Sequence, residues 1–196
     1  SRPVMIIGVD ESGKGDFFGP LVVAALAASE ADSDRLRALG ARDSKLVSDS
    51  RALAIDEVLR ASFAHAVIVI SPSEYNARYA RIKNLNKLLA EGHADAIEAV
   101  LRTQKADLAI SDKFGKPELI EGELGKRKHT IPLRQITGGE AVAQVAAASI
   151  LARAEFIRSM ERLALEYEVD LPKGAAAHVD AAGRRFVQIH GQGKLR

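Results

Sequence analysis

The stretch Val4-Met5-Ile6-Ile7-Gly8-Val9-Asp10-Glu11-Ser12-Gly13-Lys14-Gly15 decides how this chain folds. Its apolar first half predicts a buried strand over residues 4–10, and the glycines that follow predict a tight loop. Asp10 and Glu11 therefore stand at the end of a strand, with side chains that point to opposite faces. Carboxylates are costly to bury unless something positive neutralises them, and a divalent cation such as Mg²⁺ would do so. A solvated acidic turn is the simpler alternative.

The composition predicts one globular domain over residues 1–196. A hydrophobic share of 47% argues against disorder, and the net charge of +2 permits nucleic-acid binding without demanding it. The chain has no cysteine, which excludes disulfides and thiolate metal sites. We see no signal peptide and no apolar stretch that could span a bilayer, so we expect a cytoplasmic protein, and a monomer.

Apolar periodicity predicts a mixed α/β fold. Strands are expected at 4–10, 21–28, 65–71, 106–112 and 129–136, and helices at 31–39, 48–63, 73–82, 85–104, 140–168 and 175–189. The Gly-rich loop joins the first two strands, which suggests an antiparallel pair. We therefore expect a mixed five-stranded sheet flanked by helices on both faces, with a C-terminal helical part. Small residues such as Ala146 and Ala147 would let the helix at 140–168 approach its neighbour closely.

Two further acids lie where the sequence changes from one predicted element to the next. Asp112 closes the strand at 106–112, and Glu140 follows two glycines at the first turn of the long helix. Each has a structural alternative, a turn residue for Asp112 and a helix-dipole acid for Glu140. Together with Asp10 and Glu11 they suit a two-metal site, in which the ions clamp the attacking and leaving oxygens of a phosphodiester.

Several ordered motifs resemble one enzyme family. The run from Gly8 to Pro20 is similar to the opening motif of the type 2 ribonucleases H, and of ribonuclease HIII in particular. Further similar stretches follow in the family's order: Asp43-Ser44-Lys45-Leu46, Asn84-Leu85-Asn86 with Gly92-His93, residues 145–153, and Leu171-Pro172-Lys173-Gly174 with Val179-Asp180. The matches run from residue 6 to residue 180, and such a set is far more specific than any single motif.

The resemblance implies a ribonuclease H-like fold and an endonuclease that cuts the RNA strand of RNA–DNA hybrids. It implies two Mg²⁺ or Mn²⁺ ions, with products ending in 5′-phosphate and 3′-hydroxyl. It assigns metal binding and catalysis to Asp10, Glu11, Asp112 and Glu140. The last position has three competitors, namely Glu118, Glu121 and Glu123. Ribonuclease HIII proteins usually carry an additional N-terminal substrate-binding domain, whereas here the catalytic motif starts at once, which puts the strength of substrate binding in doubt.

Ten residues are predicted to contact substrate: Ser12, Gly13, Lys14, Gly15, Ser44, Lys45, Asn86, His93, Ser149 and Lys173. The segment from Gly13 to Gly15 would sense the RNA 2′-hydroxyl, because glycines let the backbone approach the sugar closely. The alternative for this segment is a plain turn.

The other predicted contacts also have structural alternatives. Ser44 and Lys45 resemble phosphate anchors for the DNA strand, but a helix cap and a solvated charge would look the same. His93 shares a helix face with Asn86 and could instead be a satisfied interior histidine. Ser149 could bond back to its own helix, and Lys173 could only flank a helix start.

Two alternative functions fit parts of the sequence. The segment from Gly8 to Lys14 matches a phosphate-binding P-loop except at Gly15, which replaces the Ser or Thr that would hold Mg²⁺. Asp10 and Glu11 would also place negative charge inside that phosphate cradle. The second alternative is a non-catalytic module that binds hybrids. The full set of acids argues against it, because pure binding favours fewer carboxylates beside phosphates.

The tyrosines lead to a prediction about substrate choice. The resemblance ascribes cleavage at a single ribonucleotide in DNA, by enzymes of the HII kind, to a tyrosine near the C-terminal part of the fold. Tyr75, Tyr79 and Tyr167 all lie outside such a motif. We expect a tract of four ribonucleotides in DNA to be cut well and a lone ribonucleotide poorly. Gel analysis of both substrates measures this, and efficient incision at the lone ribonucleotide would contradict it.

Overall fold

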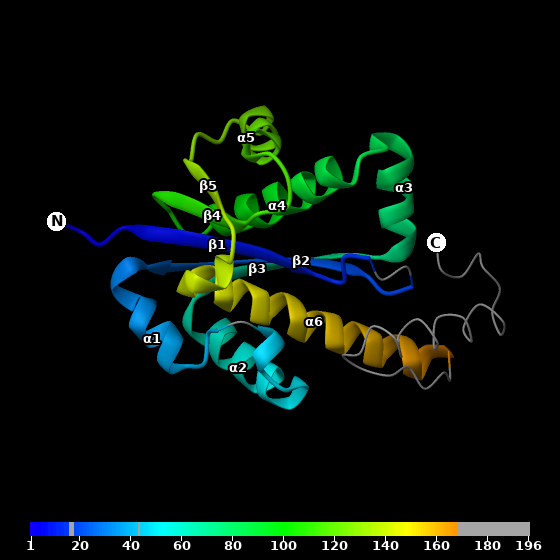
Figure 1. Ribbon diagram of the computed structural model, residues 1–196, viewed down its shortest axis with the longest axis horizontal. Coiled ribbons are helices and arrows are strands. Elements are labelled where there is room, and N and C mark those ends of the chain that lie inside the picture. The colour runs from blue at the N-terminus through cyan, green and yellow to red at the C-terminus, as the bar shows by residue number, and fades with distance from the viewer. Residues whose placement is uncertain (16–17, 43, 168–196) are drawn as a thin grey trace.

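The computed structural model describes residues 1–15, 18–42 and 44–167 (Figure 1). Its centre is a five-stranded sheet in the order β3-β2-β1-β4-β5. The strands are β1 (Met5–Ser12), β2 (Leu21–Ser29), β3 (Ala64–Ile70), β4 (Leu108–Asp112) and β5 (Leu133–Ile136). Strand β1 pairs antiparallel with β2 and parallel with β4. The predicted mixed sheet and its antiparallel first pair are therefore confirmed.

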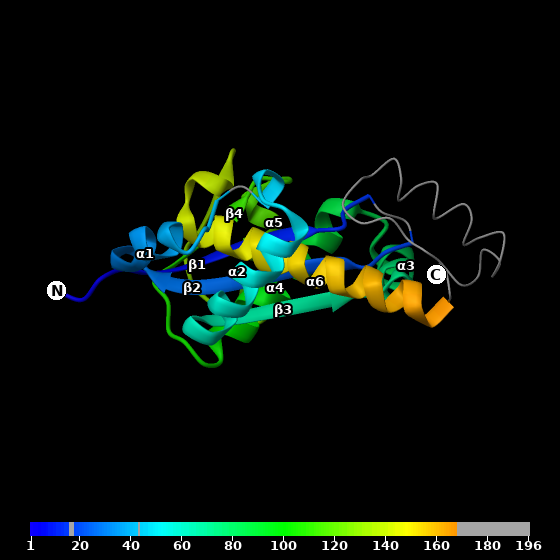
Figure 2. The same cartoon turned by 90° about the horizontal axis from the view of Figure 1, so that it is seen from below.

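Helices cover both faces of the sheet. The helices are α1 (Ser33–Ala38), α2 (Asp49–Ser62), α3 (Pro72–Ile82), α4 (Leu85–Leu101), α5 (Pro117–Lys126) and α6 (Ala143–Tyr167). Short 3-10 turns in the described part of the chain are η1 (Glu30–Asp32), η2 (Ser44–Leu46) and η3 (Gly139–Ala141). Helices α4 and α5 lie on one face, and α1, α2 and α6 lie on the other, where Figure 2 shows α6 running along the strands.

Strand β2 explains why the sheet needs two covering layers. Leu21, Val23 and Ala25 pack into the cluster that contains α4, whereas the alternate residues Val22 and Ala24 pack against α2 and α6. All five side chains are buried. A strand buried on both faces is apolar at every position, and this is the pattern of β2.

Gly8 allows the long helix to lie directly on β1. A Cβ atom built at Gly8 would fall 2.1 Å from the backbone carbon of Gln144 in α6. Ala143, Ala146 and Ala147 on this stretch of α6 are buried as well. The close approach that the small residues predicted is therefore present, and it fixes the start of α6 beside the end of β1.

The sequence prediction missed one helix and displaced several boundaries, among them the start of β4, which is at Leu108 and not at residue 106, and the end of α4, which is at Leu101 and not at residue 104. Helix α5 was not expected, because it buries only Ile120 and Leu124 and contains two glycines. The strand expected at 129–136 begins at Leu133, directly after Pro132, which lacks an N–H for strand pairing. The helix expected from residue 140 begins at Ala143, after the η3 turn.

Two further expectations concern the C-terminal helix and membrane-spanning segments. The helix expected at 175–189 lies outside the described residues. Within the described ranges, no helix is both long enough and apolar enough to cross a membrane.

The Gly8 contact leads to a stability prediction. We expect Gly8→Ala to lower the free energy of unfolding by about 3 kcal/mol, because the added methyl would overlap backbone atoms that belong to another element. The matched control is Gly122→Ala on α5, where a Cβ meets no atom of the described part of the chain within 4 Å. That change should stabilise the helix slightly, by ~0.5–1 kcal/mol. Urea denaturation measures both, and equal unfolding midpoints for the two variants would contradict the prediction.

Candidate active site

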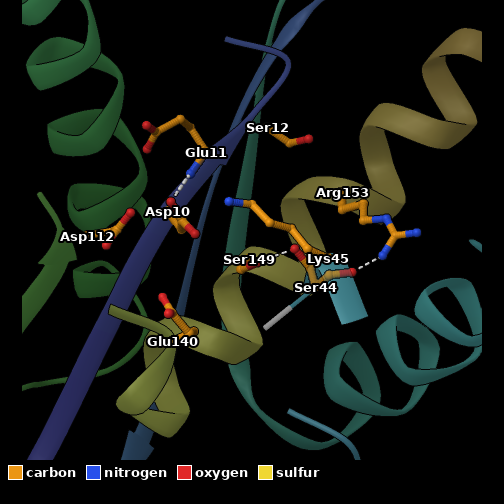
Figure 3. Close-up of a pocket in the computed structure, with 9 residues that line it drawn as sticks. All are labelled: Asp10, Glu11, Ser12, Ser44, Lys45, Asp112, Glu140, Ser149 and Arg153. Carbon is orange, nitrogen blue, oxygen red and sulfur yellow. Dashed lines mark hydrogen bonds between the residues drawn. The ribbon is translucent and has the colours of Figure 1, made fainter. Parts of the chain in front are cut away.

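The ends of β1 and β4 bring Asp10 and Asp112 together. The two strands are parallel, and Val9 is aligned with Ser111, one residue before each acid. Ile6 and Ile110 pack with Val145 of α6, so strand alternation places Asp10 and Asp112 on the α6 face. Glu11 extends toward the α4 face, where its carboxylate meets His93. The expected opposite orientation of Asp10 and Glu11 is therefore observed (Figure 3).

All four predicted acids line one pocket of about 490 Å³. They come from β1, β4 and η3, and the opposite wall comes from η2 and α6 (Figure 3). The lining residues are Asp10, Glu11, Ser12, Ser44, Lys45, Asp112, Glu140, Ser149 and Arg153. Segments more than 100 residues apart in the sequence thus meet at the strand ends.

Hydrogen bonds fix the acids that lie on the strands. The Glu11 N–H donates to Asp10 Oδ1 at 2.8 Å, and the Gly139 N–H donates to Asp112 Oδ1 at 2.9 Å. A Cβ at Gly139 would fall 3.0 Å from that Asp112 oxygen, so a glycine suits this close contact. These bonds tie the η3 turn to the end of β4, and Glu140 is held next to the acids as a result.

The acids influence one another's ionisation. Burial raises the pKa of Asp10 well above its ordinary value, and the charges of Glu11 and Asp112 raise it further. For Glu11, burial is the largest single effect and also acts upward. The His93 hydrogen bond and the charges of His93 and Lys14 outweigh it, so the pKa of Glu11 is lowered. The pocket therefore concentrates negative charge that a cation would relieve.

The donor set fits a hard divalent cation. Carboxylate oxygens are the ligands that Mg²⁺ and Mn²⁺ prefer, and four of them line this one pocket. No group of three or more Asp, Glu, His or Cys side chains within the described residues is already gathered around a single point. Glu11 and Asp112 each use one carboxylate oxygen in a hydrogen bond, with His93 and Gly139 respectively, and the second oxygen of each carboxylate would be the one that meets a cation.

Hydroxyl and basic side chains form the wall that faces the acids. The Ser149 hydroxyl donates to Ser44 Oγ at 2.7 Å, so it does not bond back to its own helix. Arg153 donates to the carbonyls of Ser44 and Val47, and its Nη2 lies 2.8 Å from Asp49 Oδ1. These bonds join η2 to α6 (Figure 3).

Arg153 was not among the predicted site residues. The signal was present in the sequence, because Arg153 lies one helical turn after Ser149. Its guanidinium adds positive charge to the pocket wall, beside Lys45.

The glycine-rich loop lies on the other side of the acids. Gly13 and Gly15 have φ angles of +88° and +91°, a region that favours glycine. Lys14 between them is exposed and lines a second hollow, of about 620 Å³, with Asp112, Lys113 and Thr137. Among the described residues, no atom lies within 4 Å of a Cβ built at Gly15, which would allow a close approach to the backbone there.

Of the predicted substrate contacts, Ser12, Ser44, Lys45 and Ser149 line the pocket, whereas Asn86 and His93 do not. Asn86 is exposed at the start of α4, beside Gly115. His93 has 0% exposure, so it has no surface to offer a substrate and is the interior histidine that the alternative described. Lys173 lies outside the described residues. The competing glutamates are all on α5, and none lines the pocket: Glu118, Glu121 and Glu123.

The P-loop alternative is wrong. A phosphate cradle requires a loop from the first glycine to the lysine, whereas residues Met5–Ser12 form strand β1. Gly8 in particular lies within the strand and contacts α6, so its N–H cannot turn around a phosphate.

The raised pKa of Asp10 leads to a prediction for the metal-free protein. Between the ordinary carboxyl pKa of 3.8 and the raised value, the folded state binds more protons than the unfolded state. Stability therefore falls as pH rises through that window. In EDTA at pH 7, we expect Asp10→Asn to raise the Tm, because the amide carries no charge to bury beside Glu11 and Asp112.

The same experiment carries its own controls. Below the ordinary carboxyl pKa, the difference between Asp10→Asn and the unchanged protein should vanish. Asp107→Asn should act in the opposite direction, because a hydrogen bond from Met5 and the neighbouring Arg2 lower the pKa of Asp107. A lower Tm for Asp10→Asn at pH 7, measured by differential scanning fluorimetry, would refute the prediction that an ionised Asp10 destabilises the metal-free protein.

Comparison with known proteins places the chain in a family. The family model described as Ribonuclease HII matches residues 7–196. Ribonuclease HIII of Protochlamydia amoebophila is 38% identical over 97% of this chain, and that of Chlamydia pneumoniae is 41% identical over 95%. The chain spans 63% of the length of each of these two relatives.

Solved structures agree in fold. The crystal structure of Bst-RNase HIII in complex with Mn²⁺ matches with a TM-score of 0.85 and 32% identity, over 98% of this chain and 65% of that chain. The RNase HII of Archaeoglobus fulgidus, solved in a complex with PCNA, matches with a TM-score of 0.81 and 33% identity, over 98% of this chain and 93% of that chain. With its sheet order, helical layers and four pocket acids, this chain belongs to the ribonuclease HII family.

Proposed function

We propose that this chain is an endonuclease that hydrolyses the RNA strand of RNA–DNA hybrids. The observation that carries the proposal is the lining of one pocket by four acids from three separate segments: Asp10, Glu11, Asp112 and Glu140. Membership of the ribonuclease HII family, and relatives named Ribonuclease HIII, support the same reaction. Because the relatives are longer than this chain, its activity on hybrids is proposed here and not taken over from them.

The four acids would hold two divalent cations, either Mg²⁺ or Mn²⁺. A relative of the same fold was crystallised with Mn²⁺, which supports this choice of metal. When bound, the ions supply a water nucleophile of lowered pKa and neutralise the departing 3′-oxygen, which leaves 5′-phosphate and 3′-hydroxyl ends. The raised pKa of Asp10 fits a ligand role, because a nearby cation would offset both the burial and the neighbouring negative charges that raise it.

The other residues would bind and orient the hybrid. Lys45 adds positive charge to the wall opposite the acids, where it would attract backbone phosphates, and Arg153, which is paired with Asp49, would hold that wall in place. Lys14 lies on the other side of Asp112, in the second hollow. The backbone from Gly13 to Gly15 would contact the 2′-hydroxyl, the group that distinguishes RNA from DNA. Basic groups on both sides of the acids suit a substrate with two strands.

A module that only binds hybrids fits the pocket less well. Four carboxylates beside phosphates repel the ligand unless cations are present, so binding alone would favour their removal. Catalysis would explain why all four acids line one pocket.

The direct test of the proposed function compares substrates and metals. We expect labelled RNA–DNA hybrid to be cut with Mg²⁺ or Mn²⁺ and to survive in EDTA, while RNA duplex and DNA duplex survive throughout. Equal cleavage of DNA duplex would remove the proposed role of the 2′-hydroxyl. Binding of hybrid without cleavage by either metal would favour the non-catalytic module.

Substitution of the acids tests their assignment. We expect Asp10→Asn and Asp112→Asn each to lower kcat by about 10³-fold or more, because each removes a proposed metal ligand. Hybrid binding should persist, since the change removes negative charge near phosphates. Glu140→Gln tests the fourth position in the same way. Glu121→Gln on α5 is the matched control, because Glu121 is exposed and lines no part of the pocket. Normal turnover by any pocket variant would exclude that acid.

A further inference from the structure

A buried chain of hydrogen bonds links two of the pocket acids behind the sheet. His93 Nε2 lies 2.8 Å from Glu11 Oε2, and His93 Nδ1 lies 3.2 Å from Ser111 Oγ. The Ser111 hydroxyl is also 2.8 Å from the carbonyl oxygen of Asp112. The chain therefore runs from Glu11 on β1, through α4, to the end of β4. It connects neighbouring strands at the positions where both carry a proposed metal ligand.

Packing holds the His93 ring in one place. The ring has 0% exposure, and the Phe114 ring lies against it with centroids 4.7 Å apart. The preceding residue, Gly92, has a Cβ position only 3.1 Å from Val23 of β2, so α4 lies close to the sheet at this turn. A larger residue at Gly92 would move α4 outward and carry His93 away from Glu11.

The buried His93–Glu11 pair carries a desolvation cost. Burying a histidine and a carboxylate together removes both from water, and an apolar pair of similar size would be as stable or more so. A leucine at position 93 would suit the apolar core of α4, which already contains Leu88, Leu89 and Ile97. The polar pair therefore points to a role for His93 in the site rather than in stability alone.

The donor geometry shows what His93 can do for Glu11. A carboxylate accepts hydrogen bonds, so the ring presents its Nε2–H to Glu11 Oε2. The bond occupies one carboxylate oxygen and leaves Oε1 as a potential metal ligand. Metal ligands are commonly oriented by such a partner, whose loss weakens metal binding or activity about 10- to 100-fold.

We propose that His93 is a positioning residue, which holds Glu11 and, through Ser111, the end of β4 in the arrangement that binds divalent metal. The inference rests on the proposed function, because it concerns the same four acids. It assigns His93 no contact with substrate. Loss of the His93–Glu11 bond should weaken metal binding and lower kcat, while the KM for hybrid stays nearly constant.

The test compares two substitutions of His93 by amide side chains of different length, which place an N–H donor at different positions. In His93→Gln, the amide N–H replaces the Nε2 donor toward Glu11. In His93→Asn, the shorter side chain reaches only toward Ser111. We expect His93→Asn to weaken Mn²⁺ binding about 10-fold or more, measured by titration calorimetry, and His93→Gln to restore most of it. Raising the Mn²⁺ concentration should recover much of the lost kcat of His93→Asn.

A second histidine–glutamate pair supplies the matched control. His129 Nε2 lies 2.9 Å from Glu98 Oε2, away from the pocket, so His129→Gln should leave Mn²⁺ binding and kcat unchanged. Equal Mn²⁺ affinity in the Asn and Gln variants and the unchanged protein would overturn the inference. A lowered Tm with normal metal affinity would do the same, and so would a raised KM alone.

The two proposals fail separately in this experiment. If the unchanged protein binds Mn²⁺ but cuts no hybrid, the proposed function fails, while calorimetry still decides the role of His93. If hybrid is cut normally and His93→Asn binds Mn²⁺ as the unchanged protein does, only the inference about His93 fails.

Discussion

The packing of α6 on Gly8 is the constraint on which the site depends. The helix lies directly on the backbone of β1, because there is no side chain between Gly8 and Gln144. This contact sets the position of everything that follows along α6, including Ser149 and Arg153. It also fixes the η3 turn, which carries Glu140 to the ends of β1 and β4. A wider separation between β1 and α6 would move Glu140, Ser149 and Arg153 away from Asp10 and Asp112.

The sheet contributes a rigid base for mutually repelling charges. Asp10 and Asp112 lie on neighbouring parallel strands, whose hydrogen bonds resist the separation that their charges favour. Burial, together with the charges of Glu11 and Asp112, raises the pKa of Asp10, and the backbone N–H of Glu11 offsets part of this shift. The Gly139 N–H donates to Asp112 in the same way. The fold thus stores an electrostatic strain that a bound cation would release, which is a general property of sites built for metal.

The two faces of the sheet carry different parts of the site. The α6 face carries the pocket, with its acids, hydroxyls and basic groups. The α4 face carries the buried support, in which His93 and Ser111 hold Glu11 and the end of β4 from behind. Strand alternation makes this division possible, since adjacent residues Asp10 and Glu11 point to opposite layers.

The sequence by itself determined the strands, most helices, and the acids at the strand ends, because these depend on local periodicity and on motifs read in order. It did not determine α5, which buries too few apolar residues to show a helical pattern. Only the tertiary structure decided that Glu140, and not Glu118, joins the acids, since that depends on how η3 packs against β4. It also decided that His93 faces Glu11 inside the protein. Periodicity places a residue on a helix face, but the partner across the interface comes from a distant part of the chain.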